Sequence, residues 1–258
     1  MTVSRATELG ERLAAVWAGG PPIATLPSEL VPASAEEAYA AQTALAARLI
    51  PTFGPIVGFK VGAPSPTAEP AAAPLLADLV RPSPAHFGSP RLRLFGIEAE
   101  VAFRFGRTLL PRPEPYGESE VSAAIETIHP AIELVETRFE RWQGPPGLAK
   151  LADIGSNGGF CFGPGSRDWR SLDLARPRVA LEIDGKLIAE RVGGNTAGHP
   201  TRTLVWLVNH TGRLGRGILA GDIVTTGSHT GIVFAGQGSR VVARVASLGE
   251  AKLILSEV

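Results

Sequence analysis

The chain has 258 residues, of which 44% are hydrophobic and 19% charged, a composition typical of a globular protein and not of a disordered one. Lysine and arginine (25 together) balance aspartate and glutamate (25), and no basic run is interleaved with aromatic residues. This excludes the charge pattern of a nucleic-acid binder, so we expect a small-molecule partner.

The single cysteine and the hydropathy of the chain indicate the cellular compartment in which we expect the protein. The only cysteine, Cys161, lies in the apolar run Phe160-Cys161-Phe162, which excludes an internal disulfide and indicates a buried, inert thiol. No stretch approaches the ~20 consecutive apolar residues that span a bilayer, and the N-terminus lacks a signal-peptide pattern. We therefore expect a cytoplasmic protein with no membrane partner.

The first part of the chain has two helical patterns. Apolar residues recur at helical spacing over Ser4–Trp17 and end before a pair of glycines. A second helix is expected to begin at a capping box, in which the Ser34 hydroxyl and the Glu37 carboxylate accept hydrogen bonds from free backbone N–H groups. This helix is expected to run to about Ile50 and to end at Pro51.

Beyond Pro51, short apolar runs alternate with glycine and proline, and the chain's 30 glycines and 22 prolines predict many turns and mostly strands. Two further helices are expected, over about Glu118–Ile128 and Thr201–Leu214. Near the end, strands are expected at Ile223–Thr226, Val241–Val245 and Leu253–Leu255. The prediction is an α+β protein with a helical portion over residues 1–55 and a curled, mixed β domain over 56–258, which together form one structural unit.

Two glutamates share one face of a predicted strand. In the segment from Gly96 to Phe105 the residues alternate, so Glu98 and Glu100 point to the same side, about 7 Å apart along the chain. Taken alone, this pattern is typical of a solvated strand edge with two harmless glutamates. A further acid is needed to suggest a site.

Glu133 supplies that acid. It lies inside the apolar run Pro130–Val135, where an unpaired carboxylate is costly to bury and therefore calls for a cation. Three carboxylates offer the oxygen ligands that hard ions prefer, which predicts Mg²⁺ or Mn²⁺ with further coordination positions left to water or substrate.

Several motifs in order resemble one enzyme family. They are Gly58-Phe59-Lys60-Val61-Gly62, Glu98-Ala99-Glu100, Pro130-Ala131-Ile132-Glu133, Gly198-His199-Pro200, Trp206-Leu207, Gly221-Asp222-Ile223-Val224 and Thr226-Gly227-Ser228. This set resembles the 2-keto-4-pentenoate hydratase / 2-oxohepta-3-ene-1,7-dioate hydratase branch of the fumarylacetoacetate hydrolase superfamily. The resemblance implies a mixed β-roll and a homo-oligomer.

The resemblance also implies roles for individual residues. Glu98, Glu100 and Glu133 match the Mg²⁺ ligands, Lys60 and Asp78 match residues that border the active site, and Ser156 matches a serine near the substrate. From the residues alone, Lys60 could equally be a surface lysine beside a turn. Asp78 could be a helix cap or turn former, and Ser156 part of an unliganded turn.

The implied chemistry is hydration of 2-hydroxypenta-2,4-dienoate or a close analogue in the catabolism of aromatic compounds. A 2-oxo carboxylate can chelate the metal, which stabilises the enolate formed on tautomerisation before water adds. Lys60 could bind the substrate carboxylate or, with a lowered pKa, relay protons.

Two alternatives stay open, a 4-oxalocrotonate-type 2-oxo acid decarboxylase and a non-catalytic, metal-stabilised binding protein. A fumarylacetoacetate-type C–C hydrolase is disfavoured because the chain has no His-x-x-Glu segment. The chain also departs from the hydratase pattern at Ala63-Pro64-Ser65-Pro66 and at Ile154, where an asparagine is common in the family, so the substrate contacts are expected to differ there.

Overall fold

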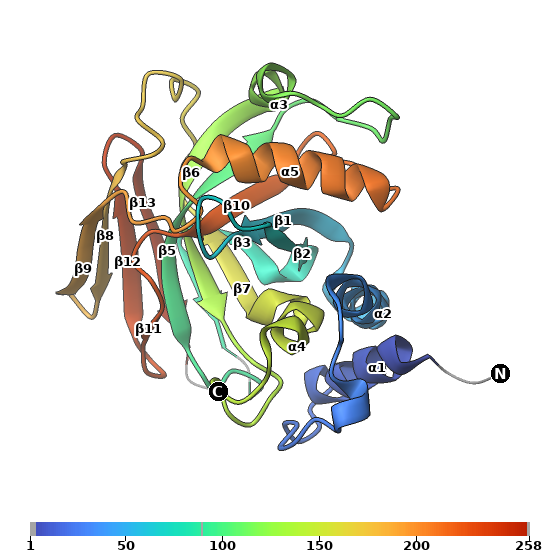
Figure 1. Cartoon of the computed structure of the whole chain (residues 1–258). Helices are drawn as coiled ribbons and strands as arrows, with labels where there is room; N and C mark the ends of the chain where they lie inside the picture. The colour runs from blue at the N-terminus through green and yellow to red at the C-terminus, as the bar shows by residue number, and fades with distance from the viewer. Residues whose placement is uncertain (1–3, 89, 257–258) are drawn as a thin grey trace.

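The computed structural model describes residues 4–88 and 90–256 and contains two β-sheets with helices on the larger one (Figure 1). The helices are α1 (Arg5–Trp17), α2 (Ala35–Phe53), α3 (Glu118–Ala124), α4 (Gly147–Ala152) and α5 (Pro200–Arg213), with short 3-10 turns η1 (Ser28–Leu30), η2 (Ala77–Leu79) and η3 (Ile154–Ser156). The strands are β1 (Ile56–Gly62), β2 (Ala71–Leu76), β3 (Val80–Pro82), β4 (Ala85–Phe87), β5 (Gly96–Phe105), β6 (Ile125–Val135), β7 (Asn157–Phe162), β8 (Arg178–Ile183), β9 (Lys186–Val192), β10 (Ile223–Ser228), β11 (Val233–Phe234), β12 (Arg240–Val245) and β13 (Gly249–Leu255).

The larger sheet has the strand order β2-β1-β10-β5-β6-β7-β3, with β11 added to β5. Only η2 separates β2 from β3 in the chain, although these strands stand at opposite ends of the order. The sheet must therefore curl so that its first and last strands approach each other. The α+β class and the mixed β-roll predicted from the sequence are confirmed.

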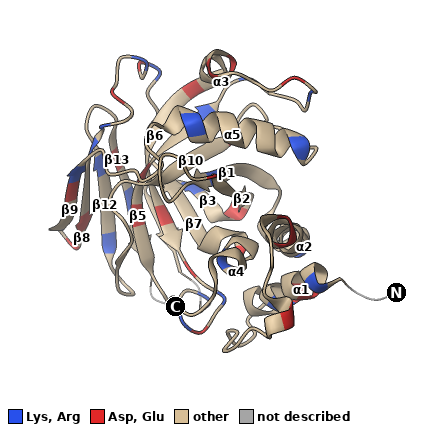
Figure 2. Cartoon of the chain, viewed as in Figure 1, with Lys and Arg blue, Asp and Glu red and all other residues tan. Residues whose placement is uncertain are grey.

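Alternation along the strands divides the core into an inside and an outside. On the inner face of the curled sheet, small and large apolar side chains form one cluster: Leu75, Ala102, Ala131, Phe160 and Ile223. On the outer face, residues such as Phe103 and Ile132 belong to the same hydrophobic cluster as Leu181 and Leu253 of the smaller sheet, which has the order β4-β13-β12-β8-β9. Basic and acidic residues are interspersed on the outer strands β8 and β9 (Figure 2).

The N-terminal helices form a third cluster with the larger sheet. Leu9 and Leu13 of α1 are buried with Leu45 and Leu49 of α2, in the same cluster as Leu76 of β2. The helical portion predicted for residues 1–55 thus shares its core with the β domain. No helix in the described ranges is long and apolar enough to cross a membrane.

The capping box predicted at Ser34 is present, and the first helix has a cap that was not predicted, at Ser4. The Ser4 hydroxyl accepts a hydrogen bond from the Thr7 backbone N–H at 3.2 Å, and the Ser34 hydroxyl accepts one from Glu37 at 3.3 Å. The Glu37 carboxylate accepts the Ala33 N–H at 2.9 Å. These side chains satisfy backbone donors that lack partners inside the helix.

The predicted stop of the second helix at Pro51 is wrong, because α2 continues through Pro51 to Phe53. Phe53 is buried against Trp17, with the ring centroids 5.1 Å apart, and Gly54 closes the helix with φ 75° and an N–H bond to the Ile50 carbonyl. Burial of Phe53 and the C-terminal glycine therefore outweigh the one hydrogen bond that proline removes.

The helix predicted over Glu118–Ile128 is also too long. It ends at Ala124, and β6 begins at Ile125 because the β-branched residues that follow pair with β5, for example Ile128 with Phe103. Pairing between strands overrides the local helical spacing. By contrast, α5 and the three strands expected near the end of the chain are confirmed, the helix to within one residue at each end.

Gly58 lies where the backbones of β1 and β10 approach closely. A Cβ atom at this position would lie 1.9 Å from the Ile223 carbonyl oxygen, whereas one at Gly62, on the same strand, meets nothing within 4 Å. We expect Gly58→Ala to lower the free energy of unfolding by about 1–3 kcal/mol or more, because a packed backbone has to move. Denaturant unfolding of both variants measures this, and equal stability of Gly58→Ala and Gly62→Ala would contradict it.

Candidate metal centre

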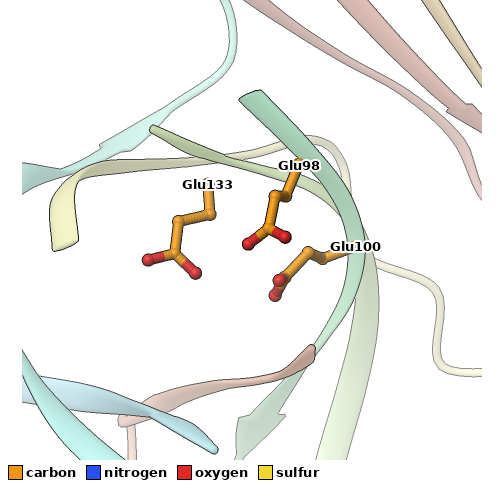
Figure 3. A group of neighbouring side chains, drawn as sticks. All are labelled: Glu98, Glu100 and Glu133. Atoms are coloured by element: carbon orange, nitrogen blue, oxygen red, sulfur yellow. The ribbon is translucent and has the colours of Figure 1, made fainter. Parts of the chain in front are cut away.

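The three predicted glutamates meet at one end of the curled sheet. Glu98 of β5 stands directly opposite Glu133 of β6 in the antiparallel ladder, and Glu100 lies two residues further along the same face of β5. One carboxylate oxygen of each residue lies within 4.8 Å of the others. Figure 3 shows the three side chains converging on a common point.

Burial and mutual repulsion raise the pKa of two of these acids. Glu100 and Glu133 are each 1% exposed, and Glu98 is partly buried. Burial first, and then the charge of Glu133, raise the pKa of Glu98 to about 7 and raise the pKa of Glu100 well above its ordinary value. Without a neutralising cation this arrangement is unfavourable, since like charges directly opposite each other destabilise a strand pair.

Lys60 provides part of the neutralising charge. Its ammonium group forms an ion pair with Glu133 Oε1 and donates to the Gly155 carbonyl at 2.9 Å. Burial acts to lower the pKa of Lys60, but the charges of Glu133 and Glu98 outweigh it and raise that pKa. The neighbouring carboxylates therefore favour the cationic form of Lys60 in this arrangement, in place of the lowered pKa considered from the sequence, and its role in the reaction stays a prediction.

Two polar side chains that the sequence did not single out also contact the glutamates. The Thr225 hydroxyl donates to Glu100 Oε2, and Asn157 Nδ2 donates to Glu133 Oε1 at 3.0 Å. Thr225 lies in a β-branched run that predicts only a strand, and Asn157 lies in a polar, glycine-rich run that predicts only a turn. No local signal in the sequence could have assigned them to the site.

The donor set fits a divalent cation. All the candidate ligand atoms are carboxylate oxygens, which suit hard ions such as Mg²⁺. Glu133 Oε2 is buried and has no hydrogen-bond partner among the described residues, an arrangement that a native structure rarely tolerates without an ion or water. One Lys60 ammonium does not balance three carboxylates, so the site has room for two further positive charges.

Ser156 lies in the chain between Gly155, which accepts from Lys60, and Asn157, which donates to Glu133, whereas Asp78 lies elsewhere. Ser156 is buried between Gly155 and Asn157, and its hydroxyl has no partner among the described residues. Asp78 is exposed in η2 and lines a separate cavity of about 500 Å³, together with Arg81 and Arg138. The structure thus brings Lys60 to the glutamates, places Ser156 in the adjoining turn and leaves Asp78 outside, and the role of Ser156 stays a prediction.

Two other side chains have structural surroundings, and for Cys161 these are the ones expected from the sequence. Cys161 is free and buried, and burial raises the pKa of its thiol to about 12, as expected for an inert residue. His199 caps α5 by accepting a hydrogen bond from the Thr201 N–H at 3.3 Å. Neither residue contacts the glutamate cluster.

Comparison with known proteins gives consistent results. 2-Keto-4-pentenoate hydratase 2 of Dechloromonas aromatica (strain RCB) is 29% identical over 251 residues, which cover 95% of each chain. 2-Hydroxyhexa-2,4-dienoate hydratase of Comamonas testosteroni is 29% identical over 160 residues, 62% of this chain and 60% of the relative.

Solved structures and a family model agree on the fold. The 4-oxalocrotonate decarboxylase from Pseudomonas putida G7, complexed with magnesium and adipate, has a TM-score of 0.85 at 23% identity and covers 100% of this chain and 99% of its own. The model of the fumarylacetoacetate (FAA) hydrolase C-terminal domain matches residues 69–253. The chain therefore belongs to the fumarylacetoacetate hydrolase family, on the branch that contains the 2-keto-4-pentenoate hydratases.

Proposed function

We propose that this protein is a metal-dependent hydro-lyase that adds water to 2-hydroxypenta-2,4-dienoate, or a close analogue, to give a 4-hydroxy-2-oxo acid in the catabolism of aromatic compounds. The observation that carries the proposal is the cluster of Glu98, Glu100 and Glu133 beside a cationic lysine. The hydratase relatives, which match over most of the chain, support the same reaction.

The cation that fits this proposal is Mg²⁺, with Mn²⁺ as the other candidate. Both prefer the oxygen ligands that the three glutamates offer, and both leave coordination positions for a substrate. When bound, the metal would supply Lewis-acid stabilisation of the enolate of a 2-oxo acid. We further propose a homo-oligomer in the cytoplasm, as in the family that the motifs resemble.

The reaction takes up one water molecule in two stages. Tautomerisation moves the enol proton to C5 and leaves a 2-oxo-3-enoate; water then adds its hydroxyl to C4 and a proton to C3. The Lys60 ammonium can bind the substrate carboxylate, because it is held cationic within the site. The unpartnered Ser156 hydroxyl can donate to a substrate oxygen.

The glutamate face continues into an apolar interior, which limits access of bulk water. Phe160 stands opposite Glu133 in the ladder and is fully buried, and Ala131 and Ala102 lie on the same inner face. A low-polarity surrounding strengthens the electrostatic effect of Lys60 on a charged substrate.

A 4-oxalocrotonate-type decarboxylase is the second candidate. A solved structure of this fold carries that activity, and loss of CO₂ from a vinylogous 2-oxo acid uses the same kind of enolate. The two reactions differ in the group at the far end of the substrate, a terminal alkene for the hydratase and a carboxylate for the decarboxylase.

An ultraviolet assay of freshly generated 2-hydroxypenta-2,4-dienoate tests the proposal. With Mg²⁺ we expect the dienol absorbance to fall and the product mass to increase by one water, and with excess EDTA we expect no turnover above the spontaneous rate. Turnover of 4-oxalocrotonate with release of CO₂, and none of the dienoate, would replace the hydratase with the decarboxylase. Turnover of neither substrate, with Mg²⁺ bound, would support the non-catalytic binding protein.

Glu133→Gln is the matching variant for this assay. It keeps the shape of the side chain but removes a ligand charge, so we expect both Mg²⁺ binding by calorimetry and turnover to be lost. Glu190→Gln is the control, because Glu190 lies on the surface and, within residues 4–88 and 90–256, its carboxylate pairs only with the exposed Arg178. Full activity of Glu133→Gln would contradict the metal site.

Lys60→Ala separates substrate binding from metal binding. We expect Mg²⁺ affinity to be retained, since all three glutamates remain, while kcat/KM falls on the order of 10²-fold because the substrate carboxylate loses its cation. Calorimetry with Mg²⁺ and steady-state kinetics on the same preparation measure the two effects. A parallel loss of metal binding would show that Lys60 belongs to the metal site alone.

The raised pKa of Glu98 makes the stability of the metal-free protein depend on pH. Because the pKa of Glu98 rises from 4.5 to about 7 on folding, the folded state binds this proton more tightly, and the resulting stability is complete below pH 4.5 and lost as the pH rises to 7. In EDTA we expect the Tm of the native protein to fall more between pH 5 and 8 than that of Glu98→Gln. Identical pH profiles would contradict the pKa shift.

A further inference from the structure

A strained turn lies directly beside the glutamates. Three consecutive residues, Ile154, Gly155 and Ser156, have positive φ values of 41°, 62° and 60°. Two of them carry side chains, and each non-glycine residue in this region costs on the order of 1 kcal/mol or more. Such a turn persists only where the surrounding structure holds it in place.

A buried ion pair holds this turn. Arg138, just beyond β6, donates through Nε to Asp153 Oδ1 at 2.5 Å and through Nη1 to the Asn157 carbonyl at 3.0 Å. The Arg138 backbone N–H also donates to Asp153 Oδ2 at 3.1 Å. Both side chains are almost fully buried, at 4% and 0% exposure, so the two ends of the turn are fastened to one guanidinium.

The turn presents two polar groups to the site. The Gly155 carbonyl accepts a hydrogen bond from Lys60 Nζ at 2.9 Å, and Asn157 Nδ2 donates to Glu133 Oε1 at 3.0 Å. Lys60 donates to the same Oε1 atom. Both donors therefore meet one oxygen of Glu133 and leave the other, Oε2, buried and without a partner.

Asn157 is oriented by a second bond. Its Nδ2 atom also donates to the Gly159 carbonyl at 3.3 Å. Because the Gly159 carbonyl and Glu133 Oε1 are both acceptors, the amino group of Asn157, and not its amide oxygen, faces Glu133. Asn157 is fully buried at the start of β7, so its short side chain has little freedom. A lysine on a flexible four-carbon stem does not fix the plane of the Glu133 carboxylate, whereas the short, buried amide of Asn157 can.

We propose that Asn157 is a positioning residue that turns Glu133 so that Oε2 faces the divalent cation, and that the turn fastened by Arg138 and Asp153 sets Asn157 in that place. This inference rests on the metal site of the proposed function. Removing the amide leaves Glu133 free to rotate, so metal affinity falls while the three ligands remain. Partners that orient metal ligands in this way contribute about 10–100-fold to metal affinity.

Calorimetric titration of the purified, EDTA-treated full chain with MgCl₂ tests this. For Asn157→Leu, which is similar in length but has no donor, we expect a 10–100-fold higher Kd for Mg²⁺ than in the native protein. Cys161→Ala is the matched control, because Cys161 is buried on the same strand but faces the outer side, towards Lys252. We expect Cys161→Ala to bind Mg²⁺ with native affinity.

A kinetic measurement distinguishes positioning from a general loss of structure. If Asn157 only orients a ligand, kcat at saturating Mg²⁺ stays close to the native value and the Mg²⁺ concentration for half-maximal rate rises. Asn157→Ala, a smaller change, serves where the leucine variant does not fold, which its Tm and circular dichroism reveal.

The outcomes separate this inference from the proposed function. Native Mg²⁺ affinity in both Asn157 variants would overturn the role of Asn157 and leave the hydratase untouched. An equal loss of affinity in Cys161→Ala would also overturn it. If the Asn157 variants bind Mg²⁺ more weakly but the native protein does not turn over the dienoate, the positioning role is supported and the hydratase is rejected. If the native protein does not bind Mg²⁺, both the positioning role and the hydratase are rejected.

Discussion

The repulsion among three carboxylates placed side by side is the constraint on which the rest of the site depends. The antiparallel register of β5 and β6 sets Glu98 opposite Glu133, and alternation along β5 adds Glu100 to the same inner face. In an apolar interior these charges oppose folding unless a cation balances them. Lys60, Asn157 and Thr225 each contact one of the acids, but only Lys60 carries charge.

The fold brings these partners from distant parts of the chain. Lys60 lies 73 residues before Glu133, and Thr225 lies 125 residues after Glu100, yet β1, β10 and β5 are neighbours in one sheet. The parallel pairing of β1 with β10 sets Lys60 level with Thr225, on the inner face that the glutamates share. The curl of the sheet places this face inside, so the same strands form both the apolar interior and the walls of the site.

Elements and residues with a strong local pattern could be predicted from the sequence, and those decided by contacts between distant segments could not. The capped start of α2 was predictable because Ser34 and Glu37 act within one turn, but its end was not, since Phe53 packs against Trp17 of another helix. Alternation identified Glu98 and Glu100, and the unfavourable burial of a lone acid identified Glu133. Asn157 could not be predicted, because its partner Glu133 lies 24 residues away and the run that contains Asn157 has a composition that indicates only a turn.

The unfavourable features of the metal-free site also explain how binding and folding are coupled. Glu98 and Glu100 are held where their charged forms are disfavoured, and the turn at Ile154–Ser156 adopts a conformation that most side chains avoid. The buried Arg138–Asp153 pair holds both ends of this turn, and the apolar core packs the strands beneath the glutamates. A cation that binds only the folded arrangement relieves the repulsion and stabilises the fold by its own binding free energy. The cation proposed for the reaction would therefore also neutralise the charge that opposes folding of the metal-free chain.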